Sequence, residues 1–437
     1  MNKRVYWFII WLQFVFMLAF GGAVLHIQRG GTKINGLAKD LILGLASVPS
    51  NGLHIFRDLL LGMEPYLVMN SDFKDGLNKL GDVVIDGYVL LSSVEKISGN
   101  SIIKLLDLNK NIVIHSWRVN FKHLKKIYKS DSLKNLDDKR IRMFHPILTS
   151  DSSIIFNTFD GVFKLDKNSN FNWSNVDNSF HHSIELDGEG YLWVPSMLNR
   201  NETLKSNSNF KKMPFFRDDA IAKLDPETGK LVFIKSIFTI LIENGYRSLV
   251  IGTGFFEIDP IHVNDIQPAL YDGDFWKKGD LLISIKHKST VFLYRPSNDK
   301  IVWLKTGPWL NQHDCDFVGS SKIAVFGNDV FRTLSGDFVV DSSNNQYIYD
   351  FRLNKTVTPF DTLFKKLSIN SIYGGRSDLI NNNLIFIEET SNGRIIIGNH
   401  KNALATYADR LDSQHIAILA WSRYYTKDEI NKLFTKK

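Results

Sequence analysis

The chain has 437 residues, of which 44% are apolar and 12% aromatic, a composition that excludes intrinsic disorder as the default state. Its formal charge is +7, but the 53 Lys and Arg residues are spread along the chain, without the dense basic block that binds a nucleic-acid backbone. The basic excess therefore predicts a solvated surface, with anionic lipid or an anionic substrate as the open alternative. A single cysteine, Cys315, excludes an intramolecular disulfide and a cysteine-based zinc site.

The amino terminus carries one long apolar run, Val5–Leu25, broken by one glutamine. A helix of about 20 apolar residues crosses a bilayer core, whereas the apolar region of a cleaved signal peptide is about 7–15 residues long. With Lys3 and Arg4 in front of it, the run predicts an uncleaved transmembrane signal anchor over residues 1–28. A cleaved signal remains the alternative, because the small residues at 21–23 offer a weak cleavage site.

Basic residues flank the apolar run on both sides, so the charge rule for membrane topology gives only a weak preference. A short basic amino terminus normally stays cytoplasmic. We therefore expect a membrane-anchored protein whose bulk is periplasmic or otherwise extracytoplasmic.

Residues 29–80 predict a helical linker. Apolar residues recur at helical spacing from Ile34 to Leu45, and Pro49 ends that pattern. A second apolar helix candidate covers His54–Met63. The sequence does not distinguish helices that lie along the membrane surface from helices that pack beneath the body.

Residues 81–437 predict an all-β body, because short apolar runs alternate with turn residues. The candidates for the first strand of a repeated unit are Tyr88–Leu91, Ser153–Phe156, Tyr191–Val194, Leu281–Ser284, Ile323–Phe326 and Leu384–Ile387. Their number and spacing favour a six-bladed β-propeller, with a large β-sandwich as the alternative. At the end of the chain Thr426 and Glu429 form a capping box that predicts a short terminal helix.

Histidines precede several of these strand candidates: His145, His181, His182, His262 and His313. A lone histidine is most often structural or on the surface, but a propeller brings equivalent positions of its blades to one mouth of the central channel. The pattern therefore predicts one polar site built from several blades. Whether His181 or His182 faces that site stays open.

Two segments carry a more specific pattern. The first contains His262 and Asn264 and then a strand that ends at Lys286-His287; the second contains Gln312-His313 and then Phe326-Gly327-Asn328-Asp329, with Ile301-Val302-Trp303 between them. These motifs resemble the arylsulfotransferase family, the PAPS-independent bacterial sulfotransferases built on a six-bladed propeller. The order and spacing hold over about residues 258–330, and weaker similarity extends back to His145 and forward to about Thr406.

The resemblance implies an aryl-sulfate sulfotransferase, which moves a sulfuryl group from an aryl sulfate to a phenolic or other hydroxyl acceptor through a sulfo-histidine, without a nucleotide donor or other cofactor. It implies His313 as the nucleophile, His262, Asn264 and Lys286 as groups that hold the sulfuryl group, and His182 as a further catalytic residue. His181, His287 and His145 are implied as substrate-binding residues. Membrane contact is expected through the N-terminal helix.

The chain departs from the family at three points. Lys286 stands where the family has arginine, which replaces a two-pronged donor by a point charge. Phe326-Gly327-Asn328-Asp329 replaces the family's F-D-N-G, and the family's cysteine pair is absent from the sequence. Each departure bears on turnover and on the usual aryl substrate.

The alternative to an enzyme is a non-catalytic, membrane-anchored propeller that binds an anionic sugar or an envelope partner protein, since a fold does not fix a function. A scaffold for envelope assembly is a third reading. The sequence contains no glycine-rich phosphate loop, H-E-x-x-H helix or EF-hand loop, so it predicts no metal or nucleotide. The enzyme would be favoured over a binding protein if the structure placed four side chains within reach of one anion: His313, His262, Asn264 and Lys286.

Overall fold

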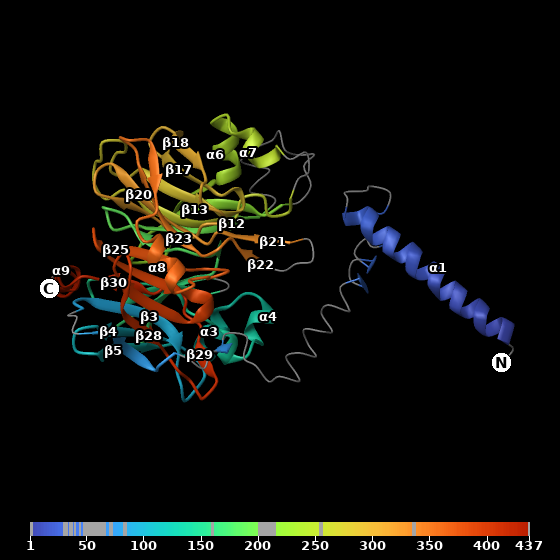
Figure 1. The fold of residues 1–437 in the computed structure, drawn as a ribbon, viewed down its shortest axis with the longest axis horizontal. Coiled ribbons are helices and arrows are strands. Elements are labelled where there is room, and N and C mark those ends of the chain that lie inside the picture. The colour runs from blue at the N-terminus through green and yellow to red at the C-terminus, as the bar shows by residue number, and fades with distance from the viewer. Residues whose placement is uncertain are drawn as a thin grey trace. The chain divides into compact units, whose positions relative to one another are not determined.

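The computed structural model describes residues 3–28, 34, 38, 41–42, 45–46, 67–69, 73–81, 85–158, 161–199, 216–252, 257–333 and 338–435. The chain forms two compact units, Met1–Pro65 and Tyr66–Lys437 (Figure 1). The expected helix at 54–63 and most of the expected amphipathic stretch at 34–45 lie outside the described residues.

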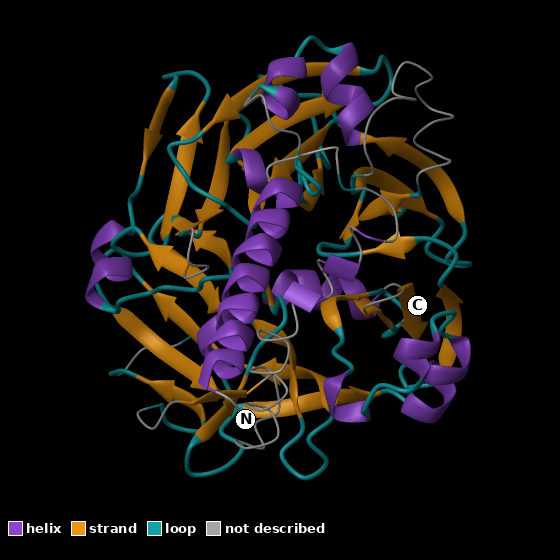
Figure 2. Ribbon diagram, turned by 90° about the vertical axis from the view of Figure 1, so that its right-hand side faces the viewer, coloured by secondary structure: helices purple, strands orange, loops and turns teal. Residues whose placement is uncertain are grey.

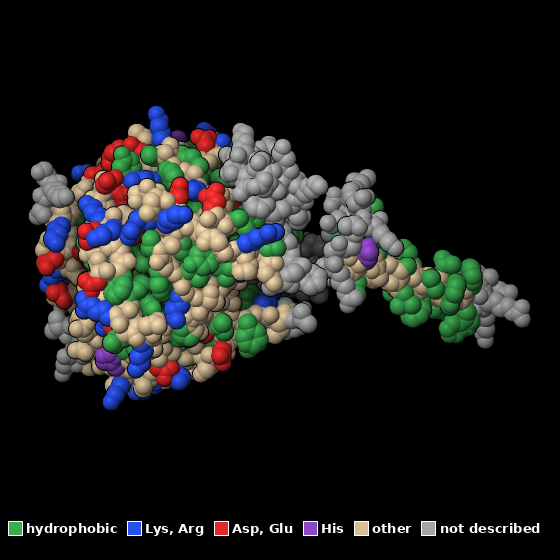
Figure 3. All heavy atoms as spheres, turned by 90° about the horizontal axis from the view of Figure 1, so that it is seen from above, with side chains coloured by type: hydrophobic (Ala, Val, Ile, Leu, Met, Phe, Trp, Pro, Cys, Tyr) green, Lys and Arg blue, Asp and Glu red, His purple; other side chains and the backbone are tan. Residues whose placement is uncertain are grey.

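The first unit contains the helix α1 (Lys3–Gln28), which confirms the apolar helix predicted at the amino terminus. Residues Ile10–Ile27 are long and apolar enough to cross a membrane, and 6% of that window is buried within the protein. Large side chains such as Trp7, Trp11 and Leu18 are 59–65% exposed. In Figure 3 the visible side chains of this helix are mostly hydrophobic, whereas the body mixes charged, polar and apolar groups. The helix is therefore a candidate membrane anchor.

The second unit is a six-bladed β-propeller, and Figure 2 shows its strands arranged as a ring. Neighbouring strands within each blade are antiparallel. Blade 1 consists of β30 (Arg423–Tyr425), β3 (Tyr88–Val94), β4 (Ser101–Asp107) and β5 (Ile112–Arg118). Blade 2 consists of β6 (Phe144–Leu148), β7 (Ile154–Thr158), β8 (Gly161–Leu165) and β9 (Phe171–Asn175). Blade 3 consists of β10 (Ser179–Phe180), β11 (Glu185–Leu186), β12 (Leu192–Leu198), β13 (Asp218–Leu224) and β14 (Leu231–Ser236).

Blade 4 consists of β15 (Val263–Pro268), β16 (Leu281–Ile285), β17 (Thr290–Arg295) and β18 (Lys300–Thr306). Blade 5 consists of β19 (Cys315–Val318), β20 (Lys322–Gly327), β23 (Asn345–Asp350) and β24 (Lys355–Val357). Blade 6 consists of β25 (Arg376–Asn381), β26 (Leu384–Glu389), β27 (Arg394–Gly398), β28 (Ala403–Ala408) and β2 (Gly76–Lys79). Two further pairs are β1 (Leu67–Met69) with β29 (His415–Ala417) and the hairpin of β21 (Val330–Arg332) and β22 (Phe338–Val340).

The ring is closed by segments from both ends of the sequence. The C-terminal strand β30 pairs with β3 of blade 1, with Tyr425 opposite Tyr88. The early strand β2 pairs with β28 at the outer edge of blade 6, with Gly76 opposite Ala408. The last part of the segment expected as a helical linker, 29–80, is therefore β-structure within the propeller unit, because its backbone groups find partners on open sheet edges.

The strands predicted as the first of each unit are in fact the second strands, β3, β7, β12, β16, β20 and β26. The innermost strands are β30, β6, β10 with β11, β15, β19 and β25, which are shorter or more polar. Carboxylates such as Asp265 and Asp316 occupy these inner strands. A short strand with such polar residues lacks the apolar alternation by which a strand is recognised in a sequence.

Short helices lie in the segments that connect one blade to the next: α3 (Phe121–Ile127), α4 (Asp131–Lys134), α6 (Ile237–Glu243), α7 (Arg247–Ile251) and α8 (Asp361–Lys366). Short 3-10 turns occur at Asp138–Arg140 between blades 1 and 2, at Lys286–Lys288 within blade 4 and at Thr390–Asn392 within blade 6. The terminal helix α9 (Lys427–Thr435) confirms the predicted capping box, because Thr426 N–H donates to Glu429 Oε2 (2.8 Å) and Glu429 N–H donates to Thr426 Oγ1 (3.2 Å).

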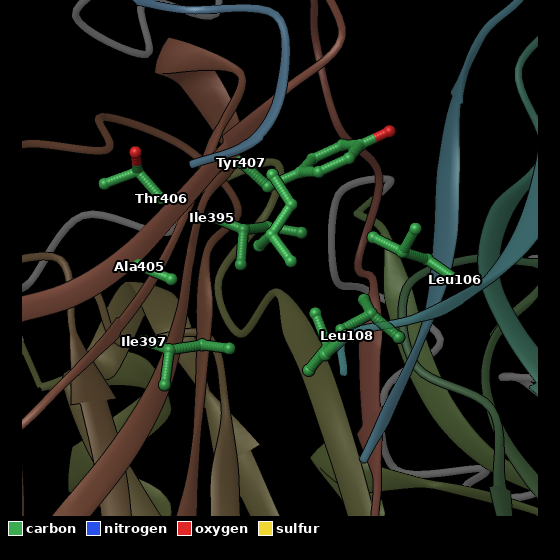
Figure 4. Close-up of a pocket in the computed structure, with 9 residues that line it drawn as sticks. Leu106, Leu108, Ile395, Ile397, Ala405, Thr406 and Tyr407 are labelled. Carbon is green, nitrogen blue, oxygen red and sulfur yellow. The ribbon is translucent and has the colours of Figure 1, made fainter. Parts of the chain in front are cut away.

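The blades pack on each other through apolar side chains. Figure 4 shows the contact of blade 6 with blade 1, where Leu106 and Leu108 face Ile395, Ile397 and Tyr407. The space between them does not admit a water molecule. This contact is a core between sheets, so it does not offer a ligand site.

Candidate functional site

Five of the predicted histidines, all except His287, lie near the start of an innermost strand, and three of these five sit in a left-handed backbone turn. The φ angles are +51° at His145, +58° at His182 and +55° at His262, and Trp421 takes +67° at the start of β30. Gly374 and Gly375 have φ of +64° and +94° before β25. A left-handed conformation is uncommon for a residue with a side chain and persists only where the surroundings fix it, which is frequent at functional sites.

Hydrogen bonds between neighbouring blades fix these turns. The backbone N–H of Val263, the residue after His262, donates to Asp219 Oδ2 of blade 3 (2.7 Å). The N–H of Trp421 donates to Glu388 Oε1 of blade 6 (2.9 Å). A carboxylate of one blade therefore holds the start of the next inner strand, and the ring geometry determines where each turn residue stands.

Four blades bring their imidazoles together, as the sequence predicts. The ring centre of His182 lies 5.1 Å from that of His262, 6.1 Å from that of His145 and 6.2 Å from that of His313. We call His145, His181, His182, His262 and His313 the histidine cluster. Burial lowers the pKa of His145, His182 and His313 well below the ordinary 6.5, and it also lowers the pKa of His262. At neutral pH these rings are therefore uncharged.

His313 is buried, and its tautomer is fixed. Its Nδ1 lies 2.7 Å from Asn328 Oδ1. The amide nitrogen of Asn328 donates to the carbonyls of Ser371 (3.0 Å) and Gly374 (2.7 Å), so the amide oxygen must face the ring. His313 Nδ1 therefore carries the proton and Nε2 carries the lone pair, which accepts from the N–H of Gly374 at 3.3 Å. An imidazole in this state is a competent nucleophile.

His262 is oriented by Asp259. Its Nδ1 lies 2.7 Å from Asp259 Oδ2, and the ring of His287 stacks on it at 4.5 Å. His287 is exposed, and its Nδ1 lies 2.8 Å from the Asp259 carbonyl. The ligand atoms of these three residues lie within 4.8 Å of one another, a spacing that fits a metal ion, although both Nδ1 atoms are already hydrogen-bonded to Asp259. The contacts favour a positioning role for Asp259.

Lys286 directly follows β16, at the start of the 3-10 turn Lys286–Lys288, and its charge acts on His262 and His313 of the cluster. Burial lowers its pKa below the ordinary 10.5, and its positive charge in turn lowers the pKa of His262 and His313. Among the residues that the structure describes, no carboxylate forms an ion pair with it. The negative charge of Asp259 raises its pKa against the effect of burial, and an anionic group next to His313 would complement the lysine charge further.

Asn264 is buried, and its amide donates to the Gln312 carbonyl (2.6 Å), directly before His313. The amide therefore braces the backbone that carries the cluster. Its carbonyl oxygen has no partner among the described residues.

His181 and His182 differ in position. Their Nδ1 atoms lie 2.8 Å apart, and His181 Nε2 lies 3.5 Å from Asp219 Oδ1. His182 stands between His145, His262 and His313, with His181 on its other side. His145 is buried and packs its ring 4.5 Å from Trp421.

The inner strands also carry buried charged side chains, and these charges were not predicted from the sequence. Arg423 binds both carboxylate oxygens of Glu185, at 2.9 and 2.6 Å, and Arg376 binds Asp378 at 2.6 Å. Burial raises the pKa of Asp265 to about 7 and raises that of Asp314 well above its usual range. These groups tie the inner strands together.

The contacts of the cluster involve residues to which sequence reasoning gave no role: Asn328, Asp259, Asp219 and Gly374. Asn328 lies in the motif that departs from the family's F-D-N-G, yet the asparagine that holds His313 is retained. Asp259 stands three residues before His262, a spacing that could have signalled its role. Asp219 and Gly374 come from other blades, so no local spacing points to them.

The family model described as arylsulfotransferase (ASST) matches residues 147–409, more than half of the chain. No curated protein matches. Similar solved structures include a protein of unknown function from Bacteroides caccae (11% identity, 77% of this chain and 98% of that chain, TM-score 0.46), the Pan2 WD40 domain of Neurospora crassa (10%, 82% and 96%, 0.42) and hydrazine synthase of Kuenenia stuttgartiensis (10%, 74% and 80%, 0.39). With its six-bladed ring and the match over residues 147–409, the chain belongs to the arylsulfotransferase family.

Proposed function

We propose that the protein is an aryl-sulfate sulfotransferase that moves a sulfuryl group from an aryl sulfate to a phenolic or other hydroxyl acceptor through a sulfo-histidine on His313. One observation carries this proposal most: His313 is buried and neutral, and Asn328 holds its tautomer so that Nε2 bears the lone pair. The positive charge of Lys286 beside it fits an anionic substrate.

In the first half-reaction, His313 Nε2 attacks the sulfur atom of the donor. A nitrogen–sulfur bond forms, the bond from sulfur to the aryl oxygen breaks, and the phenolate leaves with the electron pair. The long hydrogen bond from the N–H of Gly374 to Nε2 (3.3 Å) is released as Nε2 bonds to sulfur, and this N–H and Lys286 then stabilise the negative charge on the sulfuryl oxygens.

In the second half-reaction, the acceptor hydroxyl attacks the same sulfur atom. The nitrogen–sulfur bond breaks, its electron pair returns to His313, and the hydroxyl proton passes to a neighbouring imidazole. His182, whose ring centre is 6.2 Å from that of His313, is the candidate for this role. The two steps add up to sulfuryl transfer from donor to acceptor with ping-pong kinetics.

The test is a sulfuryl-transfer assay on the full-length protein with a chromogenic aryl sulfate and a phenol. Release of phenolate that requires the acceptor supports the enzyme. A folded protein that binds aryl sulfate without any phenolate release, even as a single turnover, would instead indicate a propeller that only binds anions.

Lys286→Met is expected to lower kcat about 10²-fold, as the loss of one charged donor typically does, and to change the pH dependence. The nucleophile must be neutral, and its pKa lies well below 6.5, so the acid limb of kcat/KM in the wild type falls below pH 6.5. Removal of the Lys286 charge raises the pKa of His313 and shifts that limb to higher pH. The pH–rate profile measures this shift.

Lys288→Met is the matched control, because Lys288 already pairs with Glu257 at 3.2 Å. Its profile should follow that of the wild type. An unchanged acid limb in Lys286→Met would show that the lysine charge does not reach the nucleophile.

We also propose that α1 anchors the propeller on the extracytoplasmic, periplasmic side of a membrane. Leu18, 62% exposed in the middle of the helix, is expected to face lipid. Leu18→Asp should cost about 3 kcal/mol of insertion and reduce the membrane-bound fraction accordingly. Carbonate extraction of membranes measures this fraction, with Leu353→Asp on the body (Leu353 is 70% exposed) as the control that should stay membrane-bound.

A further inference from the structure

We propose that Asp219 and His181 are positioning residues that fix the protons of His182, so that His182 Nε2 takes the proton of the acceptor hydroxyl. This inference rests on the proposed function and assigns the base of its second half-reaction. The two residues act through His182 and do not themselves contact the reacting atoms.

The contact of the two histidines requires one shared proton. Their Nδ1 atoms lie 2.8 Å apart, a hydrogen-bond distance, so one nitrogen donates and the other accepts. Two protons there would clash, and two lone pairs would repel. The direction of the bond is therefore decided by the other nitrogen of each ring.

Asp219 decides that direction. Its carboxylate is buried, and its Oδ2 accepts the N–H of Val263 at 2.7 Å. Its Oδ1 lies 3.5 Å from His181 Nε2, close enough to act on that nitrogen by charge, and the nitrogen makes no hydrogen bond to any described residue. A nitrogen lone pair would be repelled by the carboxylate, so His181 Nε2 carries the proton. His181 Nδ1 is then the acceptor, and His182 Nδ1 is the donor.

The consequence is a defined lone pair on His182. A neutral imidazole with its proton on Nδ1 has a free Nε2, and this atom makes no hydrogen bond to any residue that the structure describes. The ring stands among His145, His262 and His313. Burial keeps His182 neutral, since it lowers its pKa well below 6.5. The base is therefore ready before the acceptor arrives.

The proton balance is complete within the proposed reaction. When the acceptor oxygen attacks the sulfur of sulfo-His313, its O–H bond breaks and the proton moves to His182 Nε2. The new imidazolium keeps its Nδ1–H bond to His181, and Asp219 stabilises the positive charge through that ring. The proton later leaves to solvent or to the next departing phenolate.

The test separates the two half-reactions by rapid mixing. Phenolate from a good leaving group needs no proton, so the burst reports the first step, and turnover at saturating donor reports the second. Asp219→Asn keeps an oxygen for Val263 and places an amide N–H against His181 Nε2, which reverses both tautomers. We expect the burst to stay within about 2-fold of the wild type, while the acceptor step slows about 10²–10⁴-fold.

His181→Ala is the second variant, and the measurement is whether added imidazole restores its acceptor step. The side chain of His181 is 21% exposed, so added imidazole can reach the vacated place. We expect a slow acceptor step that imidazole accelerates, with greater loss for weakly acidic acceptors than for acidic phenols. His415→Ala is the control, because Asp412 holds this histidine at 2.7 Å on another part of the ring and its side chain is equally shielded, at 20%.

Two results would overturn the inference. One is equal slowing of the burst and of the acceptor step in both variants, which would indicate a structural role. The other is an unchanged acceptor step. Absence of a burst in the wild type would instead reject the proposed function itself.

Discussion

Replacement of His313 by alanine is expected to abolish both the phenolate burst and steady-state turnover, with a loss of at least ~10³-fold. The reason is specific to this ring. Asn328 and Gly374 hold it so that Nε2 is the reactive atom, and Lys286 lies beside it, so no other imidazole of the cluster has the same arrangement. Stopped-flow absorbance with a chromogenic aryl sulfate measures both phases.

The control is His400→Ala, since this ring packs on Phe360 at 4.6 Å and belongs to no part of the histidine cluster. It should retain burst and turnover. Circular dichroism of both variants shows that the propeller remains folded. Acceptor-dependent phenolate release that survives in His313→Ala would place the nucleophile elsewhere in the cluster.

The second large effect is expected on stability, from Arg423→Met. This arginine belongs to β30, the strand that closes the ring, and binds Glu185 in blade 3 with two hydrogen bonds. It also donates to the carbonyls of Ile184 (2.7 Å) and Pro146 (3.0 Å), so it connects three blades. Removal leaves the Glu185 carboxylate buried without its partner, which should cost about 3–5 kcal/mol of the free energy of unfolding.

Urea unfolding in detergent measures this cost. Arg352→Met is the matched control, because Arg352 and Asp274 form a surface ion pair with side chains 60% and 41% exposed, and such a pair contributes about 0–1 kcal/mol. Arg423→Met combined with Glu185→Leu should recover part of the loss, since no charge is then left unpaired. Equal costs at Arg423 and Arg352 would mean that the buried pair does not close the ring.

The sequence predicted the fold where strands are apolar. Runs such as Ile154–Phe156 and Leu281–Ile283 are fully buried, and they form the second strands of blades 2 and 4. The innermost strands escaped prediction because they carry buried polar groups, as β15 does at Asp265. Closure of the ring by β30 could not be predicted locally, since it pairs residue 425 with residue 88.

The sequence predicted the histidines of the candidate site, but not the residues that hydrogen-bond to them. His145, His182, His262 and His313 recur at similar places in successive blades, and the closed ring converts that register into proximity. The groups that set their protons come from afar: the N–H of Gly374 reaches His313 across 61 positions. Such contacts follow from the packing of blades, which spacing along the chain does not encode.

The most direct test of the proposed mechanism is a search for the covalent intermediate. The full-length protein is mixed with aryl sulfate in the absence of acceptor, quenched, digested and mapped by mass spectrometry under conditions that preserve a nitrogen–sulfur bond. A sulfo-histidine mechanism predicts one SO₃ group per chain, located on His313 and lost when a phenol is added before the quench. Phenolate release with no label, or with the label on another residue, would contradict it.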